Sequence, residues 1–215
     1  MLGWLTHRFR RSPAPRGLVW PTREAMWSGV LVDVSRTRAE GTAVVLVGHF
    51  RDTIEELFRR LREAGVPART GAGTLDVGRL ASGADAEVPI VRSDGLAFGG
   101  RVPEGRPDGW LRVIVAERYP LRGREDAVER AVASVRGGRV VYHGSLDDEL
   151  LEEFGAPRMR ELLARLGQAP DESLEHPMIE RAIRNAQRKL DRTVAHDASA
   201  DSARQWFAVN RPKPR

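Results

Sequence analysis

The stretch from Ser145 to Leu190 constrains the fold most, because its apolar residues recur at helical spacing in three consecutive runs. Ser145 and Asp148 form a capping-box pattern before the first run, and Gly155 supplies a left-handed stop after it. Pro157 and Pro177 suit the first turns of the second and third runs. The sequence therefore predicts three helices. Their predicted buried faces are Leu146, Leu150, Leu151 and Phe154, then Met159, Leu162, Leu163 and Leu166, then Ile179, Ala182, Ile183, Ala186 and Leu190.

Upstream of this stretch, strand-like and helical runs alternate. Residues 43–47 are a continuous β-branched run ending in Gly48, which is typical of a strand buried on both faces of a parallel sheet. The other expected strands are residues 66–68, 88–91, 109–119 and 139–143, and the helices are residues 22–39, 51–64 and 122–135. Their predicted inward residues are Met26, Trp27, Val30, Leu31 and Val34, then Ile54, Leu57, Phe58 and Leu61, then Ala127, Val128, Ala131 and Val135. This alternation predicts an α/β fold.

Several strings of the sequence resemble a known family when taken in order. SLDDELLEEFG, RMRELLARLG and EHPMIERAIRNAQRKLD are similar to the segment of the bacterial preprotein translocase motor SecA that leaves its second nucleotide-binding domain and enters the helical scaffold. GLVWPTREAMWSGVLVDV resembles the lead-in to that domain, and GWLRVIVAERY resembles the family's strand ending in Glu-Arg-His. The resemblance runs from near Gly17 to near Asp191. It implies a RecA-like parallel sheet flanked by helices, the second-lobe type of P-loop NTPase, with a C-terminal α-helical appendage.

The resemblance also suggests how the chain is divided. We expect an N-terminal arm at 1–16, a second RecA-like domain of helicase C-terminal type at 17–144, a scaffold-like helical segment at 145–195 and a polar basic tail at 196–215. Residues 12–16 read as a proline-bearing linker. Trp206 and Phe207 are expected either to dock on the protein or to mark a short interaction helix, and the final RPKPR is expected to be disordered.

A motor of this family cleaves ATP between two lobes, and its first lobe holds phosphate in a P-loop. Neither Lys189 nor Lys213, the two lysines, follows a glycine, and no acidic pair ends an apolar strand. When the family's last motif is placed by counting back without gaps from SLDDEL, its three arginine positions fall on Val128, Arg130 and Ala133. Arg130 is therefore the candidate arginine finger, against the alternative of an exposed helix arginine. The sequence favours a chain that does not hydrolyse ATP alone.

The family's Gly-Arg-Gly-Thr-Asp loop would follow the strand at 88–91, where only Asp94 and glycines such as Gly95 persist. If the motif is moved by a residue or two, Arg136 or Arg124 takes the place of Arg130. Asp94, Gly95, Arg130 and Arg136 are thus the candidate nucleotide-binding residues. No cofactor is expected, except ATP if a separate chain supplies the first lobe. The five histidines lack ligand spacing, so no metal site is expected.

The formal charge of +5 raises nucleic acid and anionic membranes as partners. Only two of the 35 basic residues are Lys, a skew that we attribute to a GC-rich genome, so nucleic acid is not the expected partner. Arg181, Arg184 and Arg188, with Arg192, face away from the apolar stripe of their helix. They form either a solvated face or a contact with an acidic partner surface or the motor itself.

Three functional hypotheses follow. The first is a SecA-like, non-catalytic binding or regulatory module linked to protein translocation, whose protein partner is the translocation machinery. The second is half of a split ATPase, which completes a site in trans with a chain carrying the first nucleotide-binding lobe. The third is a helicase-like nucleic-acid-binding remnant. No apolar run is long enough to span a bilayer and the N-terminus does not read as a secretory signal, which favours the cytoplasm with peripheral contact at the inner face of the membrane.

Overall fold

A six-stranded parallel sheet forms the centre of the computed structural model, which describes residues 15–71, 73–83, 85–156, 159–161, 169 and 171–211. The strand order is β1-β8-β7-β2-β5-β3, and every neighbouring pair is parallel. The strands of this sheet are β1 (Arg16–Trp20), β2 (Ala43–Gly48), β3 (Ala68–Thr70), β5 (Val88–Arg92), β7 (Leu111–Val115) and β8 (Gly138–Ser145). A second, two-stranded sheet pairs β4 (Thr74–Asp76) with β6 (Ala97–Gly99).

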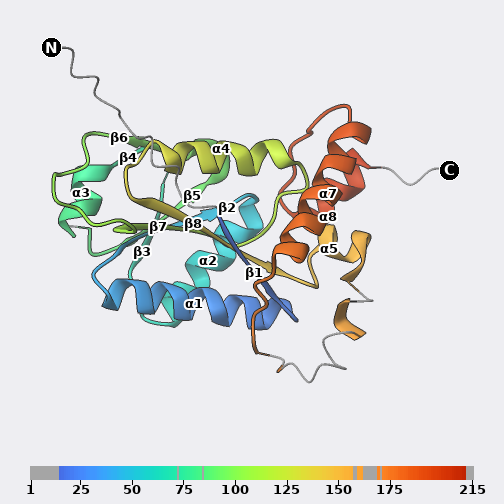
Figure 1. Cartoon of the computed structure of the whole chain (residues 1–215), viewed down its shortest axis with the longest axis horizontal. Helices are drawn as coiled ribbons and strands as arrows, with labels where there is room; N and C mark the ends of the chain where they lie inside the picture. The colour runs from blue at the N-terminus through green and yellow to red at the C-terminus, as the bar shows by residue number, and fades with distance from the viewer. Residues whose placement is uncertain are drawn as a thin grey trace, which may run out of the picture.

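Helices cover both faces of the sheet. The described helices are α1 (Arg23–Ala39), α2 (Arg51–Glu63), α3 (Val77–Ser82), α4 (Arg122–Ala133), α5 (Glu149–Phe154), α7 (Pro177–Thr193) and α8 (Ala203–Asn210), with a 3-10 turn η1 (Ser93–Gly95). Figure 1 shows α4 and α1 on opposite sides of the sheet. Side chains alternate along β2 accordingly: Val44 and Leu46 join the core under α1 and α2, whereas Val45 and Val47 join the core under α3 and α4. The predicted fold class, a RecA-like parallel sheet flanked by helices, is confirmed.

The C-terminal helices form a third layer at one end of the sheet (Figure 1). Leu146, Leu150 and Leu151 pack with Ile183, Ala186 and Leu190 of α7, and Val19 of β1 completes this cluster. The predicted α-helical appendage is thus present and is joined to the sheet through an apolar core. The predicted second helix, residues 157–166 with Leu163, lies almost entirely outside the described residues, as does the side chain of Phe154. None of the described helices is both long and apolar enough to cross a bilayer.

Most predicted elements are confirmed with small shifts in their ends. Thr22 caps α1, accepting a hydrogen bond from the Ala25 amide at 3.1 Å. The expected strand at 66–68 begins at Ala68, and the expected strand at 109–119 is confined to Leu111–Val115. Within the helices, Phe58 is 37% exposed, so its predicted inward position is wrong.

Three expectations in the terminal segments are corrected. The proline-bearing linker ends in an unpredicted strand, β1, which pairs with β8. Ser145 closes β8, and the N-cap of α5 is Asp148, although the reciprocal hydrogen bonds of the predicted capping box are present in the turn before the helix: the Asp148 carboxylate accepts from the Ser145 amide at 2.7 Å, and the Ser145 hydroxyl accepts from the Asp147 amide at 2.9 Å. In α7, Ala182 is exposed and Gln187 is buried, because the buried face is rotated slightly from the predicted stripe.

The docking alternative for Trp206 is confirmed. Trp206 lies in α8 with no exposed surface and packs with Phe50 and Tyr119, which follow β2 and β7. Its indole Nε1 donates to Asp197 at 2.7 Å. This side chain therefore helps to attach the 196–210 segment to the sheet.

We predict that Trp206→Ala lowers the free energy of unfolding by about 3–5 kcal/mol, because it leaves a cavity at a fully buried position. Urea denaturation followed by circular dichroism measures this loss. Val209→Ala on the same helix is the matched control; Val209 is 52% exposed, so we expect a change within about 0.5 kcal/mol. A Trp206→Ala variant as stable as the control would contradict the docking of α8.

Candidate functional site

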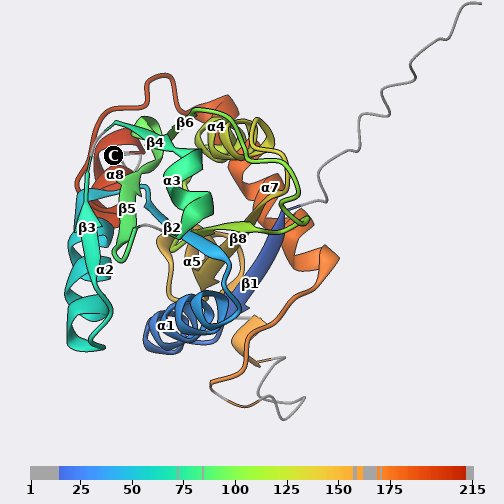
Figure 2. The same cartoon turned by 90° about the vertical axis from the view of Figure 1, so that its left-hand side faces the viewer.

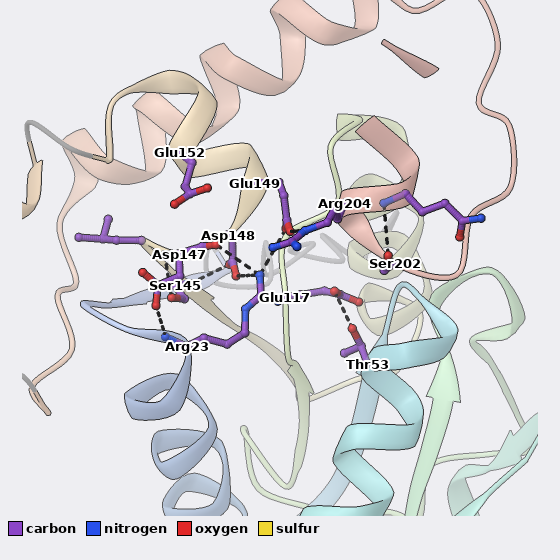
Figure 3. A network of polar contacts seen from close by, with 12 residues as sticks. Arg23, Thr53, Glu117, Ser145, Asp147, Asp148, Glu149, Glu152, Ser202 and Arg204 are labelled. Carbon is purple, nitrogen blue, oxygen red and sulfur yellow. Dashed lines mark hydrogen bonds and ion pairs between the residues drawn. The ribbon is translucent and has the colours of Figure 1, made fainter. Parts of the chain in front are cut away.

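A cavity of about 710 Å³ opens at the carboxyl edge of the parallel sheet. In open parallel α/β sheets, this edge is where ligands bind. The cavity is lined by the first turns of α1, α2, α5 and α8 and by the residues after β7. Figure 3 shows charged side chains from these elements converging there. The arrangement makes this edge the candidate site.

Glu117, two residues after β7, occupies the floor of the cavity. One carboxylate oxygen accepts from the amides of His49 and Phe50 at 2.7 and 3.0 Å, and the other accepts from the Thr53 hydroxyl at 2.7 Å. Phe50 is the N-cap of α2 and offers no side-chain acceptor, so Glu117 caps that helix from a different element. Burial raises the pKa of Glu117 to about 7, although the three hydrogen bonds oppose the shift.

A second buried carboxyl, Asp148, lies on the α5 side of the cavity. Burial raises the pKa of Asp148 to about 6, opposed by the Ser145 amide and by the charge of Arg23. The Arg23 guanidinium lies 3.5 Å from Asp148 and 3.3 Å from Glu149, and Arg204 of α8 lies 3.6 Å from Glu149. These contacts tie α1, α5 and α8 together by charge (Figure 3).

Arg118 is the most deeply buried cation described, with no exposed side-chain surface. Its guanidinium pairs with Glu125 of α4 at 3.0 Å and with Glu180 of α7, and it lies over the ring of Tyr142 at 4.3 Å. β1 passes so close that a Cβ at Gly17 would lie 2.5 Å from the Glu180 carboxylate and 2.7 Å from the Arg118 guanidinium. The glycine is therefore required where this ion pair crosses β1.

Tyr119 and Asp197 hold the C-terminal segment over the same edge. The Tyr119 hydroxyl donates to Asp197 at 2.5 Å, and Arg124 lies 3.0 Å from the same carboxylate. Next to them, His49 contacts the Ser93 hydroxyl through Nδ1 at 2.8 Å. Burial and the nearby charges of Arg118 and Arg124 lower the pKa of His49 to about 3, so this histidine is neutral at physiological pH.

The structure divides the predicted nucleotide-binding residues between two edges of the sheet. Asp94 and Gly95 lie in η1, directly after β5 and hence at the carboxyl edge. Asp94 accepts from Arg92 at 2.7 Å and lies 3.9 Å from Arg124. Arg136 is exposed and precedes β8, which places it at the opposite edge. Arg130 is exposed in the last turn of α4, beyond Arg124 on the way to that opposite edge.

The predicted partner-binding arginines do come together. Arg181, Arg184 and Arg188 line one groove beside β1.

The sequence did not predict Glu117, Arg118 and Tyr119 as site residues, although they lie in the string GWLRVIVAERY that resembles a strand of the family. The available signal was three polar residues directly after a buried strand. Within the described part of the chain, no cluster of three histidine or acidic side chains is arranged to hold a metal ion.

Comparison with known proteins gives related sequences among translocase subunits. The chain is 30% identical over 183 residues to protein translocase subunit SecA of Desulfotalea psychrophila, which covers 81% of this chain and 21% of that protein. It is 29% identical over 182 residues to the SecA subunit of Campylobacter concisus, with the same coverage of 81% and 21%. It is 41% identical over 85 residues to that of Legionella pneumophila, covering 39% and 9%. The chain spans about a fifth of the length of the first two relatives.

No family model matches the sequence. Among solved structures, the C-terminal domain of a possible DNA helicase from Lactobacillus plantarum aligns with 60% of this chain and 73% of its own, at 16% identity and a TM-score of 0.40. The C-terminal part of the Fun30 ATPase domain aligns with 76% of this chain and 54% of its own, at 14% identity and a TM-score of 0.38.

The raised pKa of Glu117 predicts a specific dependence of stability on pH. The pKa is about 7 in the folded chain against an ordinary value of 4.5 for a glutamate, so the folded state binds this proton more tightly. The stability that protonation supplies is therefore complete below about pH 4.5 and is lost as pH rises through about 7. Glu117→Gln stays neutral throughout and keeps an oxygen for the amides of His49 and Phe50.

We expect the unfolding free energy of Glu117→Gln, minus that of the wild type, to rise by about 2 kcal/mol between about pH 4.5 and about pH 7.5. Urea titrations across this range measure the difference, in which the other titrating groups cancel. Glu55→Gln, which changes an exposed carboxyl on α2, is the matched control. A flat or falling difference for Glu117→Gln would show that this carboxyl is not desolvated.

Proposed function

We propose, because this chain is a distant homologue of the SecA protein translocase subunits over about four-fifths of its length, that it acts as a non-catalytic SecA-like module. Its role is to bind or regulate a protein partner linked to translocation. It works in the cytoplasm, with peripheral contact at the inner face of the membrane. The sequence homology supports the family relationship, and the geometry of α4 and of the carboxyl edge supports the loss of catalysis.

The observation that carries this proposal is the environment of the three α4 positions that match the family's arginine motif. Val128 has no exposed surface and packs in the core between α4 and the sheet, so an arginine there would be a buried, unpaired charge. Ala133 carries no donor. Arg130 lies six residues beyond Arg124, the α4 residue that approaches Asp94, which is about 9 Å along the helix axis. α4 therefore brings only Arg124 near Asp94, and the motif arginines do not assemble there; the other described cation that contacts Asp94 is Arg92, at 2.7 Å.

The C-terminal segment supports the same conclusion. α8 places the buried Trp206 against Phe50 and Tyr119, at the ends of β2 and β7. The Asp52 amide also donates to the Asp201 carbonyl oxygen at 3.0 Å. The chain thus covers with its own residues part of the edge that would face a nucleotide.

We expect the purified chain to show no ATP turnover above the buffer background in a coupled phosphate-release assay. A full-length SecA assayed alongside serves as the positive control. Because the α4 arginine set is incomplete, Arg130→Ala should leave this background unchanged. Turnover by the purified chain that disappears in Arg130→Ala would refute the non-catalytic proposal.

A second candidate is completion of an ATP site in trans, and the exposure of Arg130 favours it. Exposed on α4, this side chain is accessible to another chain. A separate protein carrying the P-loop lobe would provide the phosphate cradle, and Arg130 would stabilise charge on the transferring phosphate. Such an arginine supplied in trans can raise a rate by roughly three to five powers of ten.

If this candidate holds, adding the chain to an isolated first nucleotide-binding lobe of SecA should raise its ATP turnover by at least about tenfold. Arg130→Ala should abolish the gain. Arg136→Ala is the matched control, because it removes another exposed arginine but from the opposite edge of the sheet. No gain on mixing, or equal loss in both variants, would exclude a role for Arg130 in trans.

A further inference from the structure

A groove of about 550 Å³ runs between the edge strand β1 and α7. Figure 2 shows α7 beside β1 at this end of the sheet. Pro15, Arg16 and Gly17 form one wall, and the other comes from the N-cap of α7 and the helix itself. The groove is separate from the cavity at the carboxyl edge, with which it shares no lining residue.

The groove carries more positive than negative charge. Four arginines line it, together with two glutamates. Both glutamates are already engaged: Glu175 pairs with Arg16 at 2.6 Å, and Glu180 pairs with the buried Arg118 and with Arg184 at 3.1 Å. Within the described ranges, neither Arg181 nor Arg188 forms an ion pair. Two guanidinium groups are thus available to an incoming acid.

The available arginines have a defined spacing. Arg181, Arg184 and Arg188 lie at positions i, i+3 and i+7 of α7 and form one row about 10 Å long, opposite the buried face. Met178 and Ala182, one turn apart, flank this row. Met178 is 71% exposed, and Ala182 is exposed although the apolar period predicted it to be buried. Methionine is a flexible apolar side chain that adapts to a binding partner.

We propose that this α7 face binds an acidic amphipathic segment of a partner protein. Carboxylates spaced three or four residues apart meet Arg181 and Arg188, and an apolar side chain of the segment covers Met178 and Ala182. This is the helix-in-groove mode of recognition, with the charges fixing its register. Arg184, already paired with Glu180, holds the wall of the groove in place.

The shape of the groove favours a protein over a lipid surface. The side chain of Arg184 is only 34% exposed and lies inside a concavity, where a flat bilayer does not reach. Glu175 and Glu180 line the groove beside its four arginines, and this mixed lining suits a peptide that carries both polar and acidic groups.

The inference deepens the proposed function by naming the chemistry of the partner, and it rests on that function in taking the chain to be a binding module. Its test does not involve ATP. Turnover by the purified chain would refute the non-catalytic role and leave the groove untouched. Failure of the peptide-binding test described below would refute the binding role of the groove and would not affect the argument from the arginines missing on α4.

The experiment measures fluorescence anisotropy of a labelled synthetic peptide on the full chain. The peptide is a helix of about 20 residues with glutamates at i, i+3 and i+7 and leucines beside them. A second peptide has the same composition in scrambled order. At about 50 mM salt we expect micromolar affinity for the first peptide, and binding at least about tenfold weaker for the second.

Charge reversal identifies the surface. Arg181→Glu with Arg188→Glu should weaken binding by at least about tenfold, and Met178→Ser should weaken it by about threefold. The matched control is Arg62→Glu with Arg136→Glu, which makes the same change in net charge at exposed arginines elsewhere. The control should change the affinity by less than about twofold. Circular dichroism verifies that each variant is folded.

Five results would overturn the proposal. They are no binding to the wild type, equal binding of the scrambled peptide, and equal loss in the control pair. The fourth is displacement of the peptide by vesicles of phosphatidylglycerol and phosphatidylcholine that do not bind the Arg181 and Arg188 variant. This result would assign the groove to lipid. The fifth is sedimentation showing a dimer that this variant dissolves, which would assign the groove to a second copy of the chain.

Discussion

The buried guanidinium of Arg118 imposes the condition that the rest of the structure has to meet. A charge without access to water is costly unless opposite charges surround it. Glu125 supplies one carboxylate from α4 and Glu180 supplies another from α7, while Tyr142 presents its ring face from β8. α7, which lies outside the sheet, thus supplies one of the carboxylates that neutralise the charge of Arg118. If α7 separated from the sheet, Arg118 would lose one of its two carboxylates, so the two parts are coupled through a single side chain.

The residues on either side of Arg118 extend this coupling to the other edge helices. Glu117 caps α2, and Tyr119 holds Asp197 and, through it, the α8 segment. Gln187 of α7 donates to the Tyr119 carbonyl oxygen at 2.9 Å. Three consecutive residues after one strand, Glu117, Arg118 and Tyr119, therefore connect four helices: α2, α4, α7 and α8. This concentration explains why the carboxyl edge is rich in buried polar groups.

The homology to SecA and the packing of α4 together explain how a chain can retain the fold while the residues at the motif positions of α4 differ. The fold depends on Val128 and its neighbours being apolar, because α4 packs against the sheet through them. The resemblance assigns two of the family's motif arginines to Val128 and Ala133 of this helix, so the proposed loss of catalysis and the packing of α4 concern the same positions. Exposed arginines lie on other surfaces too, among them Arg181 and Arg188 of α7, on the face that looks away from the sheet.

Periodicity and capping in the sequence by themselves determined α1, α2, α4, α5 and α7, the buried strand at 43–48 and the α/β class, because these depend on neighbours a few residues apart. Only the tertiary structure decided the rest. β1 exists because β8, over a hundred residues away, pairs with it, and Gln187 is buried because a Tyr119 carbonyl needs a donor. The positions of Asp94 and Arg136 at opposite edges follow from strand direction, and neither composition nor spacing contains that information.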